Sequence, residues 1–214
     1  MFTKFVDLIF PRACGLCGQK INQRYTCRKC LNILEYYQEK VVLYPKNGNY
    51  YDKLLCGFEY KSYIKNKMLQ YKFKNKRYLA KSFGDLLAYR LKQYNLCADL
   101  IVPVPIHYKR DLARGYNQSA YIAKFVGELI DIPVNKNILV KIKYNQKQSL
   151  LDVNSRKENV KNVYSVVKGN PVKDKKILLI DDIFTTGSTV NECSRVLKEA
   201  GAKEVIVATV LYGR

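Results

Sequence analysis

The chain has 214 residues, of which 48% are apolar, and a formal net charge of +20 at pH 7. This length and apolar content predict a folded, soluble protein with one α/β domain and a small appendage. The longest apolar runs are far shorter than the roughly 20 residues that a membrane-spanning helix needs, so we expect no membrane insertion. The amphipathic start of the chain, followed by Pro11 and cysteines, predicts no secretory signal and a cytoplasmic protein.

The positive charge has two readings that composition leaves open. Long-range attraction would favour polyanionic partners. Lysine supplies 28 of the 38 basic residues and accompanies abundant Asn, Tyr and Ile, all with A/T-rich codons, so genome composition explains the charge equally well. Charge alone supports non-specific attraction more readily than a defined nucleic-acid site.

Four cysteines near the amino terminus form two CxxC pairs separated by nine residues: Cys14 with Cys17, and Cys27 with Cys30. Two such pairs can close a tetrahedral thiolate site, which predicts a structural Zn²⁺ ion. Two disulfides are the alternative, disfavoured in a chain without a secretory signal. We expect a zinc module over residues 1–44 that includes a short helix within residues 31–43 and does not catalyse.

The second part of the chain is predicted to span residues 54–214, after a turn or linker at residues 45–53 that is rich in Pro, Gly, Asn and Asp. A short strand is expected at residues 54–60. Apolar spacing then predicts helices at residues 63–71 and 79–94.

Residues 61–81 hold eight Lys and Arg residues and no acid, interleaved with Tyr63, Tyr71, Phe73 and Tyr78. Aromatic rings that stack on bases beside lysines that follow phosphates are typical of single-stranded DNA binding. On this interpretation the phosphate contacts are Lys72, Lys74 and Lys76. The favoured alternative is an amphipathic helix that buries its aromatic residues and exposes its lysines to solvent.

From residue 99 onward, predicted strands alternate with predicted helices. Strands are expected at residues 99–105, 138–142, 164–167, 177–181 and 204–211, and helices around residues 120–129 and 189–200. This order predicts an α/β fold with a mainly parallel sheet and helices on both faces.

The strand predicted at residues 177–181 is apolar until Asp181 and Asp182, and a loop of small polar residues follows: Thr185, Thr186, Gly187, Ser188 and Thr189. Two adjacent carboxylates are costly to bury, so we expect them at the open carboxyl end of the strand. The loop offers hydroxyls and backbone N–H groups to a phosphate. The carboxylates suit ribose hydroxyls and help to orient a Mg²⁺-bound ligand. The alternative is an ordinary helix start capped by Ser188 or Thr189.

A basic loop at residues 107–117 follows the strand predicted at residues 99–105. Its Lys109, Arg110 and Arg114 are placed to neutralise a diphosphate, and the alternative is a solvated basic turn. We interpret His107, the single histidine, as a loop residue able to contact phosphate and not as a base that activates a nucleophile.

The string DDIFTTGST at residues 181–189 resembles the phosphoribosyl-pyrophosphate site of type I phosphoribosyltransferases. Together with RGYNQ at residues 114–118, the spaced Gln148, Leu151, Arg156 and Asn159, and the cysteine pairs, it resembles the ComF family of competence-associated proteins. Lys141 and Asn145 stand where we expect Arg and Thr in that family's mobile segment.

The resemblance implies a type I phosphoribosyltransferase fold that binds phosphoribosyl pyrophosphate with Mg²⁺, with Asp181 and Asp182 as the catalytic carboxylates. It further implies a role in DNA uptake during competence, with single-stranded DNA and other uptake proteins as partners. The alternative is an active phosphoribosyltransferase in nucleobase salvage or nucleotide metabolism, which would rely on positioning and charge stabilisation.

Overall fold

The computed structural model describes residues 12–22, 24–36, 42–43, 45, 48–107, 115–143, 162–169 and 171–213. Its main sheet has five strands in the order β1 (Val42–Leu43), β2 (Lys53–Glu59), β7 (Glu204–Tyr212), β6 (Lys176–Phe184) and β3 (Leu100–Pro103). The β1 strand pairs antiparallel with β2, and all other neighbours pair parallel. The predicted, mainly parallel sheet is confirmed.

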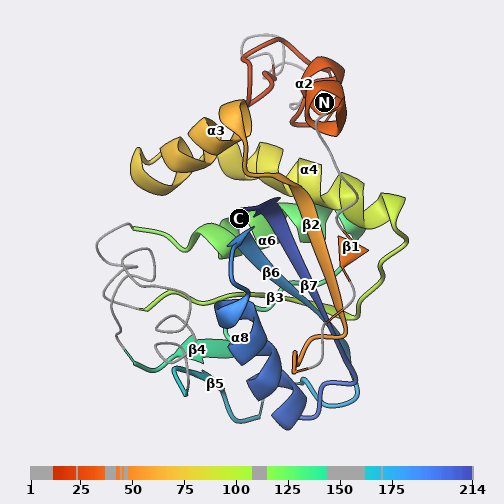
Figure 1. Ribbon diagram of the computed structural model, residues 1–214, viewed down its shortest axis with the longest axis vertical. Coiled ribbons are helices and arrows are strands. Elements are labelled where there is room, and N and C mark those ends of the chain that lie inside the picture. The colour runs from red at the N-terminus through yellow and green to blue at the C-terminus, as the bar shows by residue number, and fades with distance from the viewer. Residues whose placement is uncertain are drawn as a thin grey trace, which may run out of the picture.

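Helices cover both faces of this sheet (Figure 1). One face packs against α3 (Ser62–Phe73), α4 (Leu79–Gln93) and α6 (Gln118–Ile130), and the other against α8 (Ser188–Glu199). A small antiparallel sheet of β4 (Leu139–Lys141) and β5 (Tyr164–Val166) lies on the α8 side. No helix in the described ranges is long and apolar enough to cross a membrane.

The β6 strand shows how the sequence builds these two layers. Ile177 and Leu179 belong to the core under α8, whereas Leu178 and Ile180 belong to the core under α4 and α6. Successive strand residues point to opposite faces, so a strand buried on both faces is apolar throughout. This pattern explains the continuous apolar run before Asp181.

The expected helix within residues 31–43 is placed differently in the structure. Helix α2 is Arg28–Tyr36, and Val42–Leu43 forms the edge strand β1 on β2. Val42 pairs with Leu55 and Leu43 with Leu54. Backbone pairing with β2 therefore determines the conformation of these two residues, although the apolar pattern of the sequence predicted a helix.

The cysteine segment packs on α4, and its apolar side chains join the core beneath that helix. Leu16, Leu31 and Leu34 lie in the same buried cluster as Leu79 and Phe83. In Figure 1 this segment, with α2, stands at one end of the molecule above α3 and α4. The boundary at residues 45–53 stays a prediction.

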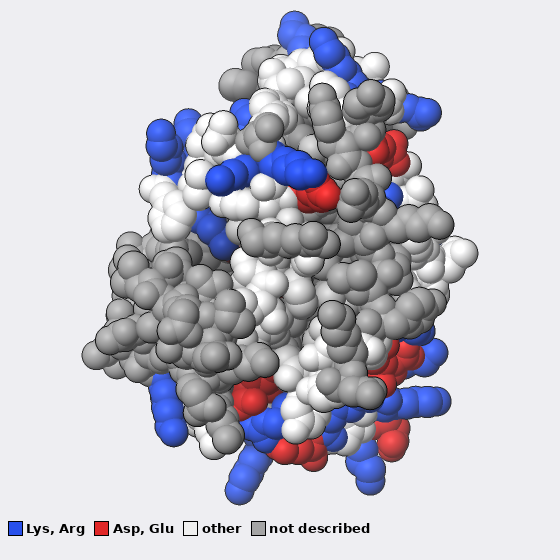
Figure 2. All heavy atoms as spheres, in the orientation of Figure 1, with Lys and Arg blue, Asp and Glu red and all other residues white. Residues whose placement is uncertain are grey.

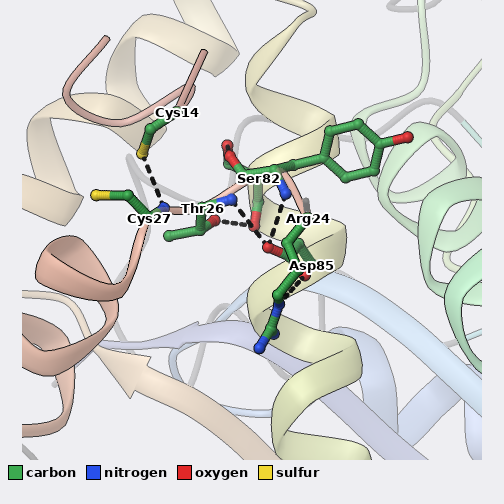
Figure 3. Close-up of polar contacts among 7 residues, drawn as sticks. Cys14, Arg24, Thr26, Cys27, Ser82 and Asp85 are labelled. Atoms are coloured by element: carbon green, nitrogen blue, oxygen red, sulfur yellow. Dashed lines mark hydrogen bonds and ion pairs between the residues drawn. The ribbon is translucent and has the colours of Figure 1, made fainter. Parts of the chain in front are cut away.

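A buried carboxylate on α4 fastens this segment. Asp85 accepts hydrogen bonds from Arg24 Nε at 3.0 Å, Tyr25 N at 3.1 Å and Thr26 N at 2.9 Å. One turn earlier, Ser82 Oγ donates to the Tyr25 carbonyl oxygen at 2.6 Å. Figure 3 shows these contacts joining the segment just before Cys27 to α4. Such complete pairing is what a buried carboxylate requires.

Candidate functional site

The two predicted carboxylates lie where the edge of β6 becomes open. Pairing of β6 with β3 ends at Ile180, opposite Pro103, whereas pairing with β7 continues as far as Phe184 opposite Tyr212. Asp181 and Asp182 therefore belong to the strand itself, which is longer than expected, and follow the last residue paired with β3. Ligands of open α/β sheets bind at this end of the strands.

Three neighbouring groups contact these carboxylates in the described chain. Asp181 Oδ1 accepts from Ser119 Oγ at 2.8 Å and from the Asp182 backbone N–H at 2.9 Å. Asp182 Oδ1 forms an ion pair with Lys72 Nζ at 2.8 Å. Ser119 belongs to the first turn of α6, where the helix dipole favours a nearby negative charge.

The electrostatic state of Asp181 is unusual for a carboxyl group. Burial, and next the neighbouring Asp182 carboxylate, raise the pKa of Asp181 from 3.8 to about 7, while Lys72 and Ser119 oppose this rise. Two adjacent carboxylates in a poorly solvated place disfavour double ionisation. Cations or hydroxyl donors brought by a ligand would relieve that repulsion.

The loop after β6 has the geometry of an anion site. Gly187 has φ +76°, and a Cβ at this residue would come within 2.7 Å of the Phe184 ring, so the conformation requires glycine. Helix α8 begins at Ser188, and its N-cap residue Gly187 has no side chain to cap it; Thr186 Oγ1 lies 2.9 Å from Ser188 Oγ and accepts a long hydrogen bond from Ser188 N at 3.4 Å. Backbone N–H groups at a helix N-terminus whose N-cap residue is glycine are suited to bind phosphate.

Loop and carboxylates line one pocket of about 270 Å³, whose wall is formed by Lys72, Asp181, Asp182, Ile183, Phe184, Thr185, Thr186, Gly187, Ser188, Thr189 and Val190. All seven residues predicted from the DDIFTTGST string are therefore brought together. Lys72, from a distant helix, also lines the pocket, and Ser119 of α6 holds the Asp181 carboxylate by a hydrogen bond; the sequence analysis assigned neither residue to this site.

Lys72, which the sequence analysis assigned to a DNA phosphate, forms an ion pair with Asp182 beside the phosphate loop, although the two segments are far apart in sequence. A signal was present in the sequence, because Ile64, Met68 and Lys72 follow the i, i+4, i+8 spacing of one helical face. Ile64 and Met68 are buried, so a lysine next on that stripe points toward the protein.

The rest of the basic segment behaves partly as the amphipathic alternative predicts. Tyr71 is fully buried, but Phe73 is 66% exposed and Tyr78 is 51% exposed. Lys74 and Lys76 are exposed between them. Figure 2 shows several basic side chains at the α3 end of this face with a few acidic ones near them, and mixed basic and acidic side chains at the opposite end.

Several predicted residues cannot be placed. Lys109, Arg110 and Arg114 of the basic loop lie outside the described residues, as do Asn145, Gln148, Leu151, Arg156 and Asn159. His107 is described and is buried, at 5% exposure. The assignment of the basic loop to a diphosphate therefore stays a prediction.

The cysteine pairs come together as predicted. All four sulfur atoms, those of Cys14, Cys17, Cys27 and Cys30, lie within 4.8 Å of one another. All four are free thiols, and Cys17 Sγ lies 3.6 Å from Cys27 Sγ, far from a disulfide length of about 2.05 Å. A tetrahedral zinc site with Zn–S of about 2.3 Å separates its sulfurs by about 3.8 Å, so these residues fit a four-coordinate metal.

Backbone N–H groups support this cluster. Cys27 N donates to Cys14 Sγ at 3.3 Å, and Cys30 N donates to Cys27 Sγ at 3.4 Å. Such donors favour thiolates, the form that binds metal. With four sulfur ligands and no open position, the cluster suits a structural ion.

Comparison with known proteins agrees with the fold. The family described as "Phosphoribosyl transferase domain" matches residues 117–214, which include β6, the loop and α8. The sheet with helices on both faces and this match define a phosphoribosyltransferase-like protein with a four-cysteine cluster near its amino terminus.

Similar proteins identify the family to which the chain belongs within this class. Competence protein F of Haemophilus influenzae is 30% identical over 201 residues, which cover 91% of this chain and 87% of that protein. The chain therefore belongs to the ComF family of competence proteins. Competence protein ComFC of Bacillus subtilis is 27% identical over 88% of this chain and 72% of its own length. DNA utilization protein YhgH of Escherichia coli is 31% identical over 51% of this chain and 47% of its own length.

Proposed function

We propose that the pocket at the carboxyl end of β6 binds phosphoribosyl pyrophosphate as its Mg²⁺ complex. The observation that supports this most is one pocket combining two adjacent carboxylates with a helix N-terminus whose N-cap residue is glycine. The 5-phosphate binds the loop of residues 185–189, and the ribose 2- and 3-hydroxyls donate hydrogen bonds to Asp181 and Asp182. Mg²⁺ held by the ligand's phosphate oxygens would offset the charge of the diphosphate.

The ionised carboxylates are the stronger acceptors for ribose hydroxyls. Hydroxyl donors and the cation that the ligand brings both favour ionisation of Asp181, whose pKa in the free protein is about 7. Ligand binding and ionisation of the carboxylate pair therefore support each other.

We further propose a role in DNA uptake during competence, in the cytoplasm and together with other uptake proteins. The relatives' names, Competence protein F and DNA utilization protein, support this role. Single-stranded DNA binds the exposed end of the basic segment, where Phe73 and Tyr78 offer rings for stacking and Lys74 and Lys76 offer charge. A reducing compartment suits the seven cysteines, all of which are free thiols.

The metal of the four-cysteine cluster is proposed to be Zn²⁺ in a structural role. Four sulfur donors at tetrahedral spacing favour zinc over the hard cations. The cluster holds the segment that docks on α4 and takes no part in chemistry at the pocket.

Calorimetry with wild-type protein and Mg²⁺ tests the ligand assignment. Saturable binding of phosphoribosyl pyrophosphate is expected, with weaker binding of ribose 5-phosphate, which lacks the diphosphate. No measurable binding of either ligand by folded, zinc-loaded protein would contradict the proposal.

Salt-dependent DNA binding tests the second part. Affinity for single-stranded DNA should fall steeply as salt rises, because each neutralised phosphate releases counterion. Changing Lys74 and Lys76 to Gln should reduce that slope, and Phe73→Ala should weaken binding by about 1–3 kcal/mol per lost stack. Lys72 is left unchanged in this test because it contacts Asp182.

Product analysis separates this role from the enzymatic alternative. Labelled phosphoribosyl pyrophosphate is incubated with a panel of bases and with DNA. Absence of single-strand binding at low salt, together with pyrophosphate release on addition of one base, would overturn the DNA role and establish a phosphoribosyltransferase.

A further inference from the structure

Lys72 is held in the pocket by a rigid attachment at the carboxyl end of α3. Its neighbour Tyr71 is fully buried and donates its hydroxyl to the Gln118 carbonyl oxygen at 2.8 Å, at the start of α6. Tyr116 Oη in turn donates to the Tyr71 carbonyl oxygen, and the two rings pack with centroids 5.6 Å apart. The backbone at Lys72 is thereby tied to the helix start that also carries Ser119.

The Lys72 side chain lines the pocket instead of extending into solvent. It is 20% exposed, its ammonium lies 2.8 Å from Asp182 Oδ1, and it lines the same pocket as the phosphate loop. One ammonium beside two carboxylates leaves the pair incompletely neutralised. A partly buried lysine of this kind is costly unless it has a charged partner.

The ligand's covalent structure determines what would lie beside this ammonium. With the 5-phosphate on the loop and the ribose hydroxyls on the carboxylates, the diphosphate on C1 is attached next to the carbon that carries the 2-hydroxyl. A cation that touches one of these carboxylates is therefore close to the diphosphate. Lysine has three donors on a flexible stem, so its ammonium can move from a carboxylate to a phosphate oxygen.

We infer that Lys72 is a ligand-binding residue of this pocket: in the complex its ammonium contacts the diphosphate, and ribose hydroxyls replace it on Asp182. This rests on the proposed function, namely that the pocket binds phosphoribosyl pyrophosphate. Lys72 is then both the resident counter-ion of the free carboxylates and the group that distinguishes a diphosphate ligand from a ribose phosphate.

The competing explanation is that Lys72 only orients Asp182. An orienting role predicts that removal of the ammonium weakens every ligand whose ribose contacts the carboxylates. A diphosphate contact predicts a loss confined to ligands that carry the diphosphate. Ribose 5-phosphate and phosphoribosyl pyrophosphate share the ribose and the 5-phosphate, so the pair separates the two roles.

The test is equilibrium binding of both ligands, with Mg²⁺, to wild type and to Lys72→Gln. A charge-assisted contact predicts a loss of about 10- to 100-fold for phosphoribosyl pyrophosphate and less than about threefold for ribose 5-phosphate. Lys72→Arg keeps the charge and should recover part of the loss. Lys65→Gln, on the exposed side of the same helix, is the matched control and should bind as wild type does.

Equal losses for the two ligands, or an unchanged affinity for phosphoribosyl pyrophosphate, would overturn the inference. Wild-type protein that binds neither ligand would instead contradict the proposed function. Folding of Lys72→Gln is checked by its zinc content and denaturant midpoint, and Lys72→Met, which keeps the length of the stem, provides a second variant.

Discussion

Two acidic sites in this molecule use the same carboxylate chemistry for different purposes. Asp85 on α4 accepts three hydrogen bonds, from Arg24 Nε and the backbone N–H groups of Tyr25 and Thr26. At the end of β6, Asp181 and Asp182 lie side by side and share three contacts in the described chain, one of them between themselves. A satisfied carboxylate joins two parts of a fold, and a pair left short of positive charge and donors is suited to receive them from a ligand.

The surroundings of the two sites also differ: one is closed and the other is open. The Asp85 site is closed by packing, since the cysteine segment and α4 share one apolar core. The β6 site opens into a pocket beside the start of α8. Changes at the first site should therefore affect stability, and changes at the second should affect binding.

Loss of the metal should affect the first site most strongly. Cys27→Ser removes a ligand one residue after Thr26, which donates to Asp85, so the docked segment should detach. Wild type should carry about one zinc per chain, and the variant should lose the metal and the folding free energy of its binding, on the order of 10 kcal/mol. Metal analysis and thermal unfolding measure both effects.

Cys97→Ser is the matched control, because this thiol is exposed and lies outside the cluster. It should keep its zinc. Wild type prepared under reducing conditions without bound metal would contradict the zinc assignment.

Removal of the Asp85 carboxylate should have the next largest effect. Asp85→Ala leaves the Tyr25 and Thr26 N–H groups and the Arg24 guanidinium without their acceptor, which should lower the free energy of unfolding by about 3 kcal/mol. Denaturant unfolding measures this loss. Glu128→Ala, at an exposed acid on α6, should change stability by less than about 0.5 kcal/mol. Similar values for the two variants would contradict the role assigned to Asp85.

Removal of the Asp85 carboxylate should destabilise the protein, whereas removal of the Asp181 carboxylate should stabilise it at high pH. Folding raises the pKa of Asp181 from 3.8 to about 7, so folding favours its protonated form. This stability is present below pH 4 and is lost as pH rises through 7. Asp182, Lys72 and Ser119 interact with it directly, and the Cys193 thiol of α8 is also close enough to interact with its charge. Asp181→Asn should be more stable than wild type at pH 8, by roughly 1–3 kcal/mol, and close to it at pH 4.

Unfolding free energies of wild type and Asp181→Asn at several pH values between 4 and 8 measure this difference. The difference between the two proteins cancels the contributions of other titrating groups. A difference that does not change with pH would contradict the environment assigned to Asp181.

A smaller effect links Lys72 to this titration. Lys72 lowers the pKa of Asp181, so Lys72→Gln should raise that pKa further. Ribose 5-phosphate favours the ionised carboxylate, so its affinity should rise with pH. In Lys72→Gln this rise should occur at a higher pH than in wild type. An unchanged pH profile of binding would show that Lys72 does not influence the pair.

The parts of both sites that lie within one short segment could be predicted from the sequence. The apolar run ending at Asp181, the loop at residues 185–189 and the CxxC pairs are such segments, and the structure brings the members of each together. Local periodicity and spacing determine these features because their geometry depends on neighbours in sequence.

The rest of both sites depends on contacts between distant residues. Asp85 is one polar position in the predicted helix at residues 79–94, and its partners lie 59 to 61 residues earlier. Lys72 resembles the surrounding lysines, and only its spacing from Ile64 and Met68 distinguishes it. Ser119 reaches Asp181 across 62 residues. Tertiary packing creates these contacts, and a pattern within one segment does not contain them.

Calorimetric titration of Mg²⁺-phosphoribosyl pyrophosphate into an Asp181→Asn, Asp182→Asn double variant tests the central claim most directly. The substitutions open no cavity, and the stability gained by removing the Asp181 charge should offset the loss of the ion pair between Lys72 and Asp182, so zinc content and the denaturant midpoint should stay close to those of wild type. The affinity should fall by at least about 100-fold, whereas Glu128→Gln should bind as wild type does. A well-folded double variant with wild-type affinity would contradict the account.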